Sequence, residues 1–395
     1  MSKKTMRVLA GMGLAWGLAA AAAVGGDWPG WRGPNRDGKS TDTGLIKEWP
    51  AGGPAPLWTA ADIGKGFSTV AVTRDAIYTT GDVGSDLTLF AFDGGGKLKW
   101  KVVQGPACTT GHPGSRSTPV VDGDKLYVVG AGGAVSGHRV ADGGQVWKRE
   151  LKEFGGSPGN WGFAESVLIL DNMAIVTPGG KSALVALDKA TGADIWRSDC
   201  PGKAHYSSPI VIKDKVGAII VQGTGDGLVA VNAKDGRKIW SNDFCRGNTA
   251  NCPDPAYADG FLFWANGYGK GGICFKVECT DGKWEFKDAW QTKDMVCHHG
   301  GYIIEKGLIY GNHGNGWACL DLKTGQVKWT DPKTFGKGSV CFADGMLYLF
   351  GESGGRVGLA AASPDGFKLA GDFKVAGSGP SWAHPVVIGG RLYLR

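Results

Sequence analysis

The segment Ala186-Leu-Asp-Lys-Ala-Thr-Gly-Ala-Asp-Ile-Trp196 has the pattern A-x-D-x-x-T-G-x-x-x-W, and this pattern returns along the chain. Close copies, which we call the tryptophan repeat, end at Trp240 and Trp329, and shorter ones end at Trp100 and Trp147. Each copy is typical of an apolar strand, a tight Asp/Gly turn and a second strand that closes on tryptophan. Self-similarity of this kind indicates one supersecondary unit copied around or along an axis.

A second element precedes each copy, and its clearest example is Ser117-Thr-Pro-Val-Val-Asp-Gly-Asp-Lys-Leu-Tyr127. An Asp-Gly turn between alternating apolar runs is a strong signal for a β-hairpin. Eight such hairpins occur, at residues 67–78, 117–127, 164–176, 207–221, 254–264, 299–310, 339–348 and 383–393. A hairpin followed by a tryptophan repeat makes a unit of four strands.

Seven of these units close on an aromatic residue, at Trp100, Trp147, Trp196, Trp240, Trp290, Trp329 and Phe373. The eighth hairpin has no repeat after it, whereas Pro56-Leu-Trp-Thr59 resembles a closing strand with no hairpin before it. We therefore predict an all-β fold: an eight-bladed β-propeller of four-stranded blades, its ring closed by the N-terminal strand. Closure of this kind removes the exposed sheet edges of an open array.

The N-terminus is typical of a secretory signal peptide. Lys3, Lys4 and Arg7 precede an apolar run, and small residues follow before Asp27. We predict a signal peptide over 1–26, an N-terminal arm over 27–54 and the propeller over 55–395. The mature chain is then expected in the periplasm or outside the cell, without a membrane span. No cysteine lies near the cleavage region, which argues against a lipid anchor.

Charge and cysteine content narrow the function classes. The formal charge of +6 includes three charges in the signal peptide, and no Lys/Arg cluster indicates a nucleic-acid surface. Nine cysteines in an exported chain allow disulfides, and the pairs to test are Cys245/Cys252 and Cys274/Cys279. The absence of any C-x-x-C pattern removes the usual zinc, thioredoxin-like and haem signals.

The tryptophan repeat resembles the repeat of the quinoprotein, or PQQ-type, eight-bladed β-propellers, over about residues 55–395. Within that superfamily the chain looks most like small exported PQQ-repeat proteins of undefined activity. The segments that carry this likeness are Trp28–Gly38, His298–Gly301, Lys337–Ser339 and His384–Val386. The resemblance implies a propeller with tryptophans docked between neighbouring blades.

Two better-understood relatives bracket the function that the resemblance implies. Quinoprotein alcohol dehydrogenases bind PQQ and calcium over the axis, and they typically clamp the quinone with adjacent cysteines, a pair that this chain lacks. It also lacks their long insertions. The propeller lipoprotein of the outer-membrane assembly machinery is a scaffold without cofactor, but its lipid-anchor cysteine is missing here.

Candidate site residues follow from aligning the hairpins on Pro119. Three places earlier, where each innermost strand is expected to begin, stand large and varied residues: Phe67, Arg116, Glu165, Tyr206, Cys252, His298, Lys337 and Trp382. One place later stand mostly small residues: Ser68, Ser117, Ser166, Ser207, Pro253, His299, Gly338 and Ala383. Innermost strands converge at one mouth of the channel, and convergent polar groups there are the default site hypothesis.

The predicted ligand-binding residues at this mouth are Arg116, Glu165, Tyr206, His298, His299, Lys337, Trp382 and His384. Arg116 and Lys337 could hold an anionic group, and Trp382, with Trp161, could stack on a planar ring. Glu165 or His298 could act as acid or base. The plainer interpretation is that these residues seal the channel with water and salt bridges.

Other polar residues favour structural roles. Asp142, Asp188, Asn232 and Asp321 stand before Gly turns, where such side chains bond nearby backbone amides. His298 and His299 are adjacent in a predicted strand and so point to opposite faces, which disfavours a shared metal ion. A metal site that combines these histidines with His313, Cys297 and Cys319 is therefore a weak hypothesis.

Three functions remain open from the sequence. The first is a non-catalytic binding or scaffold protein that uses the channel mouth or face, with other envelope proteins or a small ligand as partner, and no cofactor is expected for it. The alternative is a small quinoprotein-like oxidoreductase that binds PQQ with calcium. The third is binding of a sugar or cell-wall fragment by the mouth aromatics.

Overall fold

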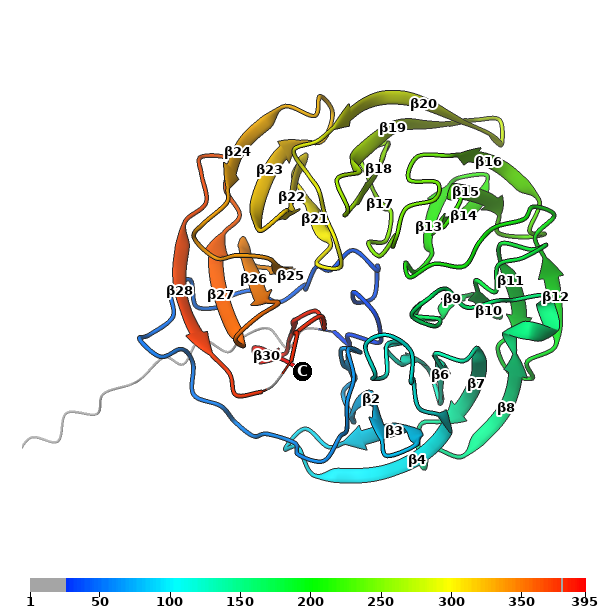
Figure 1. Cartoon of the computed structure of the whole chain (residues 1–395), viewed down its shortest axis with the longest axis horizontal. Helices are drawn as coiled ribbons and strands as arrows, with labels where there is room; N and C mark the ends of the chain where they lie inside the picture. Colours follow the sequence, from blue (N-terminus) through cyan, green and yellow to red (C-terminus); the bar gives the residue numbers. More distant parts are fainter. Residues whose placement is uncertain (1–25, 378) are drawn as a thin grey trace, which may run out of the picture.

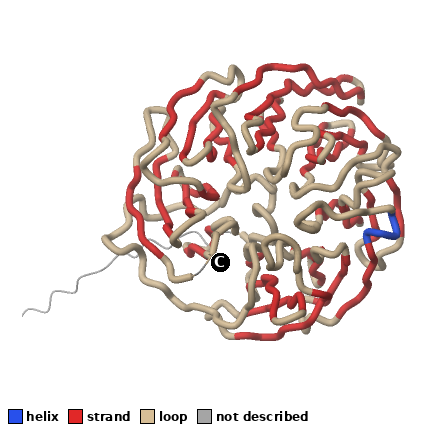
Figure 2. The backbone as a smooth tube through the Cα atoms, in the orientation of Figure 1, coloured by secondary structure: helices blue, strands red, loops and turns tan. Residues whose placement is uncertain are grey.

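The computed structural model describes residues 26–377 and 379–395, so nearly all of the predicted signal peptide falls outside the described residues. The described chain is almost entirely β-structure, as Figure 2 shows. Its one helical element is the 3-10 turn η1 (Leu151–Phe154). No helix in the described ranges has the length and apolar character needed to cross a membrane.

Seven antiparallel sheets have four strands each, and within each sheet the strands lie side by side in chain order. The first four sheets are β1 (Ala71–Val72), β2 (Ile77–Val83), β3 (Asp86–Phe92), β4 (Leu98–Pro106); β5 (Val120–Asp122), β6 (Lys125–Val129), β7 (Ala134–Arg139), β8 (Gln145–Glu150); β9 (Leu168–Leu170), β10 (Met173–Val176), β11 (Val185–Asp188), β12 (Asp194–Arg197); and β13 (Ile210–Asp214), β14 (Gly217–Thr224), β15 (Gly227–Asn232), β16 (Lys238–Asn242).

The next three four-stranded sheets and the last, two-stranded one complete the set. They are β17 (Ala256–Ala258), β18 (Phe261–Asn266), β19 (Gly271–Thr280), β20 (Lys283–Thr292); β21 (Tyr302–Glu305), β22 (Leu308–His313), β23 (Gly316–Asp321), β24 (Val327–Asp331); β25 (Gly338–Ala343), β26 (Met346–Gly351), β27 (Arg356–Ala361), β28 (Leu369–Lys374); and β29 (Val386–Ile388), β30 (Arg391–Tyr393).

The eight sheets are blades arranged around a central channel (Figure 1). In the seven four-stranded blades the first strand lies nearest the centre and the fourth lies at the rim, whereas the eighth blade has only β29 and β30. This confirms the predicted eight-bladed β-propeller. The first strands begin at one end of the channel, which we call the mouth. They lead into their hairpin turns at the opposite end, which we call the hairpin end.

The tryptophans that close the repeats bind across the seams between blades. The indole N–H of each donates to a backbone carbonyl in the next blade, at Val140 from Trp100, Lys189 from Trp147, Ala233 from Trp196, Leu322 from Trp290 and Ser363 from Trp329. In four of these seams the ring packs on the turn glycine of the next blade, and in the fifth Trp329 packs on Phe367, with ring centroids 5.7 Å apart. Gly236 has a φ of +73°, and its counterpart Gly192 in the preceding blade has a φ of +75°. A Cβ added to Gly236 would lie 2.5 Å from the Trp196 ring. Only glycine fits a left-handed turn pressed against an indole.

The seam around the last blade uses the same contacts, supplied by N-terminal residues. The Trp58 indole N–H donates to Gly94 O, and a Cβ on Gly96 would lie 2.5 Å from its ring. Gly53, with φ of +81, packs in the same way against the Phe373 ring. Residues 56–59 form no hydrogen-bonded strand, however, so closure by an N-terminal strand is not confirmed. Docked side chains join the seam instead.

The seam between the fourth and fifth blades departs from this pattern. β19 and β20 have ten residues each, the longest strands of the described chain. Phe286 on β20 stacks on Trp240 with ring centroids 4.3 Å apart and planes at 9°. Trp240 therefore packs against a neighbouring aromatic ring.

All nine cysteines lie in the described part, and none is joined to another there. Cys245 and Cys274 are buried in the apolar core between blades four, five and six. They pack as small apolar residues.

Candidate functional site

Strand pairing fixes which residues line the mouth. Val120 pairs with Tyr127, and Ile303 pairs with Tyr310, and each tyrosine leads across its sheet to the closing tryptophan. Counting back four residues from Val120 gives Arg116, whereas the same count from Ile303 gives His299. The sequence alignment predicts His298 at this place in the ring. It is therefore shifted by one residue in the sixth blade.

The third blade shows the same shift. Leu168 pairs with Ile175, so the residue equivalent to Arg116 is Ala164, and Glu165 is equivalent to Ser117. The bonds agree: Ser117 Oγ accepts from Val129 N, and Glu165 Oε1 accepts from Thr177 N. The ring at the mouth consists of Phe67, Arg116, Ala164, Tyr206, Cys252, His299, Lys337 and Trp382.

The eight predicted site residues therefore divide into two groups. Five share the mouth ring and are half-buried: Arg116, Tyr206, His299, Lys337 and Trp382. His298 lies next to this ring. Glu165 and His384 are deeper in the channel wall, with 2% and 4% of their surface exposed.

Below the mouth ring, a belt of hydrogen bonds joins neighbouring innermost strands. The backbone N–H of each of four residues donates to a side-chain oxygen of the next blade, over 2.6–3.0 Å, from Thr69 to Thr118, from Thr118 to Ser166, from Ser166 to Ser208 and from Ser208 to Asp254. Thr69 Oγ1 also donates to His384 O, which joins the eighth blade to the first. The belt therefore fixes the backbone directly below the mouth residues.

Glu352 is the centre of the polar cluster at the mouth, although the sequence analysis did not select it. It follows β26, and its carboxylate accepts from Lys337 Nζ at 3.0 and 3.1 Å and from Trp382 Nε1 at 2.9 Å. His299 Nε2 lies 3.1 Å from the same Oε1. The bond to His299, above all, lowers the pKa of Glu352, so the group is ionised.

The two adjacent histidines of this cluster are neutral. Burial lowers the pKa of His298 to about 3, and the neighbouring His299 and Lys337 add to the effect. Burial likewise lowers the pKa of His299, although its bond to Glu352 opposes the shift. Neutral His298 can accept at Nδ1, which lies 3.0 Å from Lys337 Nζ. Lys337 thus lies between a carboxylate and an imidazole.

On the other side of the mouth, Arg116 is held by backbone carbonyls. Its guanidinium donates to Gly114 O at 2.6 Å and to His112 O at 2.8 Å, and it lies 5.7 Å from the Phe67 ring centroid. Phe67 in turn packs on Trp382, with centroids 4.5 Å apart. Burial lowers the pKa of Arg116 from its usual value.

Glu165 is a buried carboxyl beside the channel axis. It accepts from the backbone N–H and the hydroxyl of Thr177, and burial raises its pKa to about 7 against these bonds. Arg36, from the N-terminal segment, is the nearest cation that favours its ionised form. The group sits behind the belt rather than at the mouth.

Residues 28–42, which we call the channel segment, run through the centre of the ring, where Figure 1 shows them in dark blue. The segment contacts turns at the hairpin end, with Gly390 N donating to Asp42 Oδ2 and Lys39 Nζ to Glu305 Oε2. Nearer its start the segment reaches the belt, where Trp31 Nε1 donates to Asp254 and the Trp31 and His384 ring centroids lie 4.6 Å apart. The axis is therefore filled by the chain itself.

The donor set at the mouth does not fit a calcium-held quinone. Calcium takes six to eight oxygen ligands, whereas the mouth carboxylate, Glu352, already accepts from His299, Lys337 and Trp382. In the described ranges no group of three or more His, Cys, Asp or Glu side chains could hold a metal ion. Arg116 and Lys337, the cations expected for an anionic ligand, both have partners within the protein.

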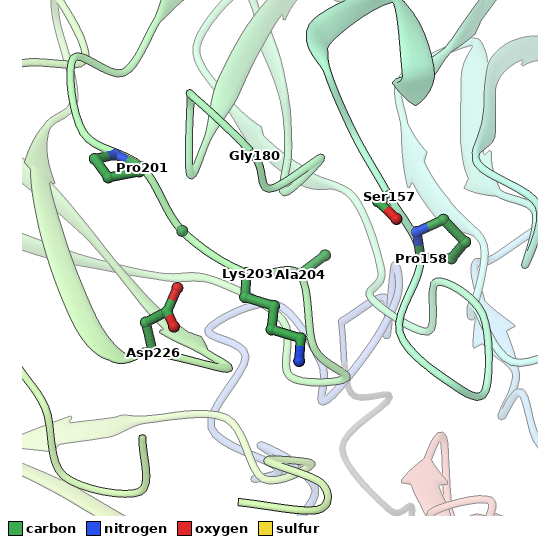
Figure 3. Close-up of a pocket in the computed structure, with 8 residues that line it drawn as sticks. Ser157, Pro158, Gly180, Pro201, Lys203, Ala204 and Asp226 are labelled. Atoms are coloured by element: carbon green, nitrogen blue, oxygen red, sulfur yellow. The ribbon is translucent and has the colours of Figure 1, made fainter. Parts of the chain in front are cut away.

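A separate pocket opens between the third and fourth blades (Figure 3). Its volume is about 330 Å³, and its lining residues are Ser157, Pro158, Gly180, Pro201, Gly202, Lys203, Ala204 and Asp226. A second pocket of about 520 Å³ shares Pro201 and Asp226 and adds Lys238 and Arg246. Sequence reasoning missed both pockets, because the first is lined by loops and turns between blades and the second by strands β14–β16 together with such loops.

Comparison with known proteins separates fold from function. The family model described as outer membrane protein assembly factor BamB matches residues 39–160 and 156–357. The assembly factor BamB of Nitrosomonas eutropha is 27% identical over 165 residues, which is 41% of this chain and 38% of that protein. The match thus spans well under half the length of that curated relative.

Solved structures of both bracketing classes share the fold. BamB from Moraxella catarrhalis superposes with a TM-score of 0.63 and 15% identity, covering 83% of this chain and 90% of its own. A europium-containing methanol dehydrogenase gives 0.64 and 11%, covering 91% and 87%. The quinohemoprotein alcohol dehydrogenase of Comamonas testosteroni gives 0.61 and 12%, covering 93% and 76%. Since the assembly factor and the dehydrogenases score alike, the architecture does not choose between them.

Proposed function

The chain belongs to the family described as outer membrane protein assembly factor BamB, a family of PQQ-repeat β-propellers, and from this membership we propose that it is a non-catalytic scaffold that binds another protein of the cell envelope through its mouth face. The proposal includes export by the predicted signal peptide. The assembly role in the name of the Nitrosomonas eutropha relative points to the same kind of partner.

The observation that carries the proposal is the closed network around Glu352. Its carboxylate accepts from three side chains, and one of these, Lys337, also contacts His298. A catalytic acid or base needs a free proton-transfer position toward a substrate, whereas a network with satisfied partners rigidifies a surface. The mouth groups therefore favour a shaped binding face.

Aromatic side chains around this network suit a protein partner. Tyr268 stands in the turn between β18 and β19, has 53% of its surface exposed and packs 5.0 Å from His298. Trp161 and Tyr206 are half-buried on the same face and pack edge to face. Tyrosine and tryptophan are enriched in protein–protein interfaces because they offer large contact area with a polar tip.

The test places a photo-crosslinking amino acid at Tyr268, and at Tyr257 as a matched control. Tyr257 is an exposed tyrosine of the same blade that precedes the turn at the hairpin end. We expect irradiated cells to give a discrete crosslinked envelope protein from position 268 and none from 257. Equal yields from both positions, or none, would contradict binding through the mouth face.

A titration of PQQ with calcium into the mature chain separates the enzyme alternative. We expect no heat and no shift in melting temperature, because Arg116, Lys337 and Glu352 are already paired. An Arg116→Ala/Lys337→Ala double variant serves as control. Micromolar binding that this variant loses would favour a quinoprotein-like oxidoreductase and count against the scaffold.

A further inference from the structure

The channel segment is bound much as a peptide ligand is bound. It contacts seven of the eight blades through specific bonds and close contacts, and most of them join its side chains or amides to the backbone of innermost strands. The blade residues contacted are Val72, Val121, Ser166, Val167, Asp254, Tyr302, Phe342, His384 and Gly390.

Two arginines four residues apart bind backbone carbonyls on the channel wall. Arg32 donates to Tyr302 O at 2.6 Å in the sixth blade, and Arg36 donates to Ser166 O at 2.9 Å and Val167 O at 3.0 Å in the third. Bonds from a guanidinium to carbonyls fix both position and direction. The segment thus spans the channel from one wall to the opposite one.

Buried acidic groups complement these arginines. Asp254 accepts from Trp31 Nε1 and from Ser208 N, and both arginines stabilise its ionised form electrostatically. Glu165 lies on the opposite wall near Arg36. Burial raises the pKa of both carboxyls, and the arginines of the segment oppose this shift. The channel wall therefore presents carboxyl groups to the two arginines of the segment.

The channel segment also holds its own shape. The Trp28 ring packs over Gly33, where a Cβ would lie 3.1 Å away, and Gly38 N donates to Arg32 O. Residues 43–64 then lead out along the rim to the first blade without forming a strand, and most of them are exposed. Within this stretch Trp49 and Trp58 dock on the ring through their side chains, but no strand pairing ties the stretch to a sheet, so the channel segment can act as a separable unit.

We propose that the central channel is a peptide-binding site, that residues 28–42 are its built-in ligand, and that the same segment of a second copy of this chain can occupy it. The contacts within one chain and between two chains are identical, so only the effective concentration set by the tether favours the chain's own segment. The inference does not depend on the mouth face being a docking surface.

The test uses the whole mature chain with a protease recognition sequence inserted between Ala55 and Pro56, both of which are exposed. After cleavage of the folded protein, a fluorescent peptide of residues 27–50 is added. We expect the cut segment to stay with the ring through gel filtration, and the labelled peptide to replace it up to one per ring.

A peptide with Arg36→Ala is the matched control, and it should compete roughly tenfold or more weakly because it loses two charge-assisted bonds. Equal competition by both peptides, absence of exchange, or collapse of the ring on cleavage would each overturn the proposal. Circular dichroism after cleavage distinguishes collapse from release.

Discussion

The seams between blades and the axis of the ring are packed in opposite ways. Five seams pack an indole against a glycine turn and bond its N–H to a backbone carbonyl, so the same arrangement recurs around the ring. The axis buries Arg32, Asp254 and Glu165, and the bonds from Arg32 to Tyr302 O and from Trp31 to Asp254 each occur once. The repeat buries apolar side chains in the same way at successive seams. The buried polar groups at the axis are instead paired by residues 28–42, which lie outside the repeat.

The largest expected effect belongs to a seam. Trp196→Ala should lower the free energy of unfolding by about 3–5 kcal/mol, because it leaves a cavity against Gly236 and removes the bond to Ala233 O. Urea unfolding followed by circular dichroism measures the loss. Ile195→Ala, at the exposed neighbouring residue, should change stability by less than about 0.5 kcal/mol. Similar losses for the two variants would show that the indole is not the seam contact.

The seams are the part of the molecule that the sequence predicts well. The tryptophan, the turn glycine and the spacing between them are all set by one contact, so the contact leaves a pattern in each blade. The eighth blade shows the limit. Trp58 was recognised as a closing residue, yet the strand expected around it does not form, because side-chain docking does not require strand pairing.

At the axis, Glu165→Gln should change how stability depends on pH. Burial raises the pKa of Glu165 to about 7 from a usual value of 4.5, so the folded state keeps a proton that the unfolded state releases between these values. The wild type should therefore lose stability as pH rises from 4.5 to 7, relative to the variant, by up to about 3 kcal/mol. Melting temperatures of both proteins across this range give the difference. A difference that does not vary with pH would mean that Glu165 is ionised throughout.

Trp58→Ala compares a seam made by the repeat with the one made by N-terminal residues. Trp58 is only half-buried, so its loss should cost about 2 kcal/mol, less than the loss of Trp196. The same unfolding measurement ranks the two. An equal or larger loss at Trp58 would make the N-terminal segment the principal lock of the ring.

The smallest effect is expected at the seam that departs from the pattern. Phe286→Ala removes the ring stacked on Trp240, and we expect a loss of about 1 kcal/mol. Phe286→Leu keeps the apolar contact and should recover part of it. No change in either variant would leave Trp240 held by Phe275 alone, which it meets edge to face at 4.8 Å.

The candidate site was predictable only in part. Alignment of the hairpins predicts the mouth ring, but in two blades the alignment is shifted by one residue. Only strand pairing shows that the ring contains His299 rather than His298, and Ala164 rather than Glu165. Glu352 was missed because it lies in a loop after β26, where no repeat position marks it. No local sequence pattern predicts that residues 28–42 lie in the channel, because the residues they contact are far away in the sequence.

Those distances have a consequence for how the protein folds. Trp31 meets Asp254 across 223 residues, Arg32 meets Tyr302 across 270 and Asp42 meets Gly390 across 348. Contacts this remote form slowly, since the intervening chain must first be ordered. The segment synthesised early in translation thus finds its last partner only when the final hairpin exists. We therefore expect folding to end when the earliest residues enter a ring that the latest ones have just closed.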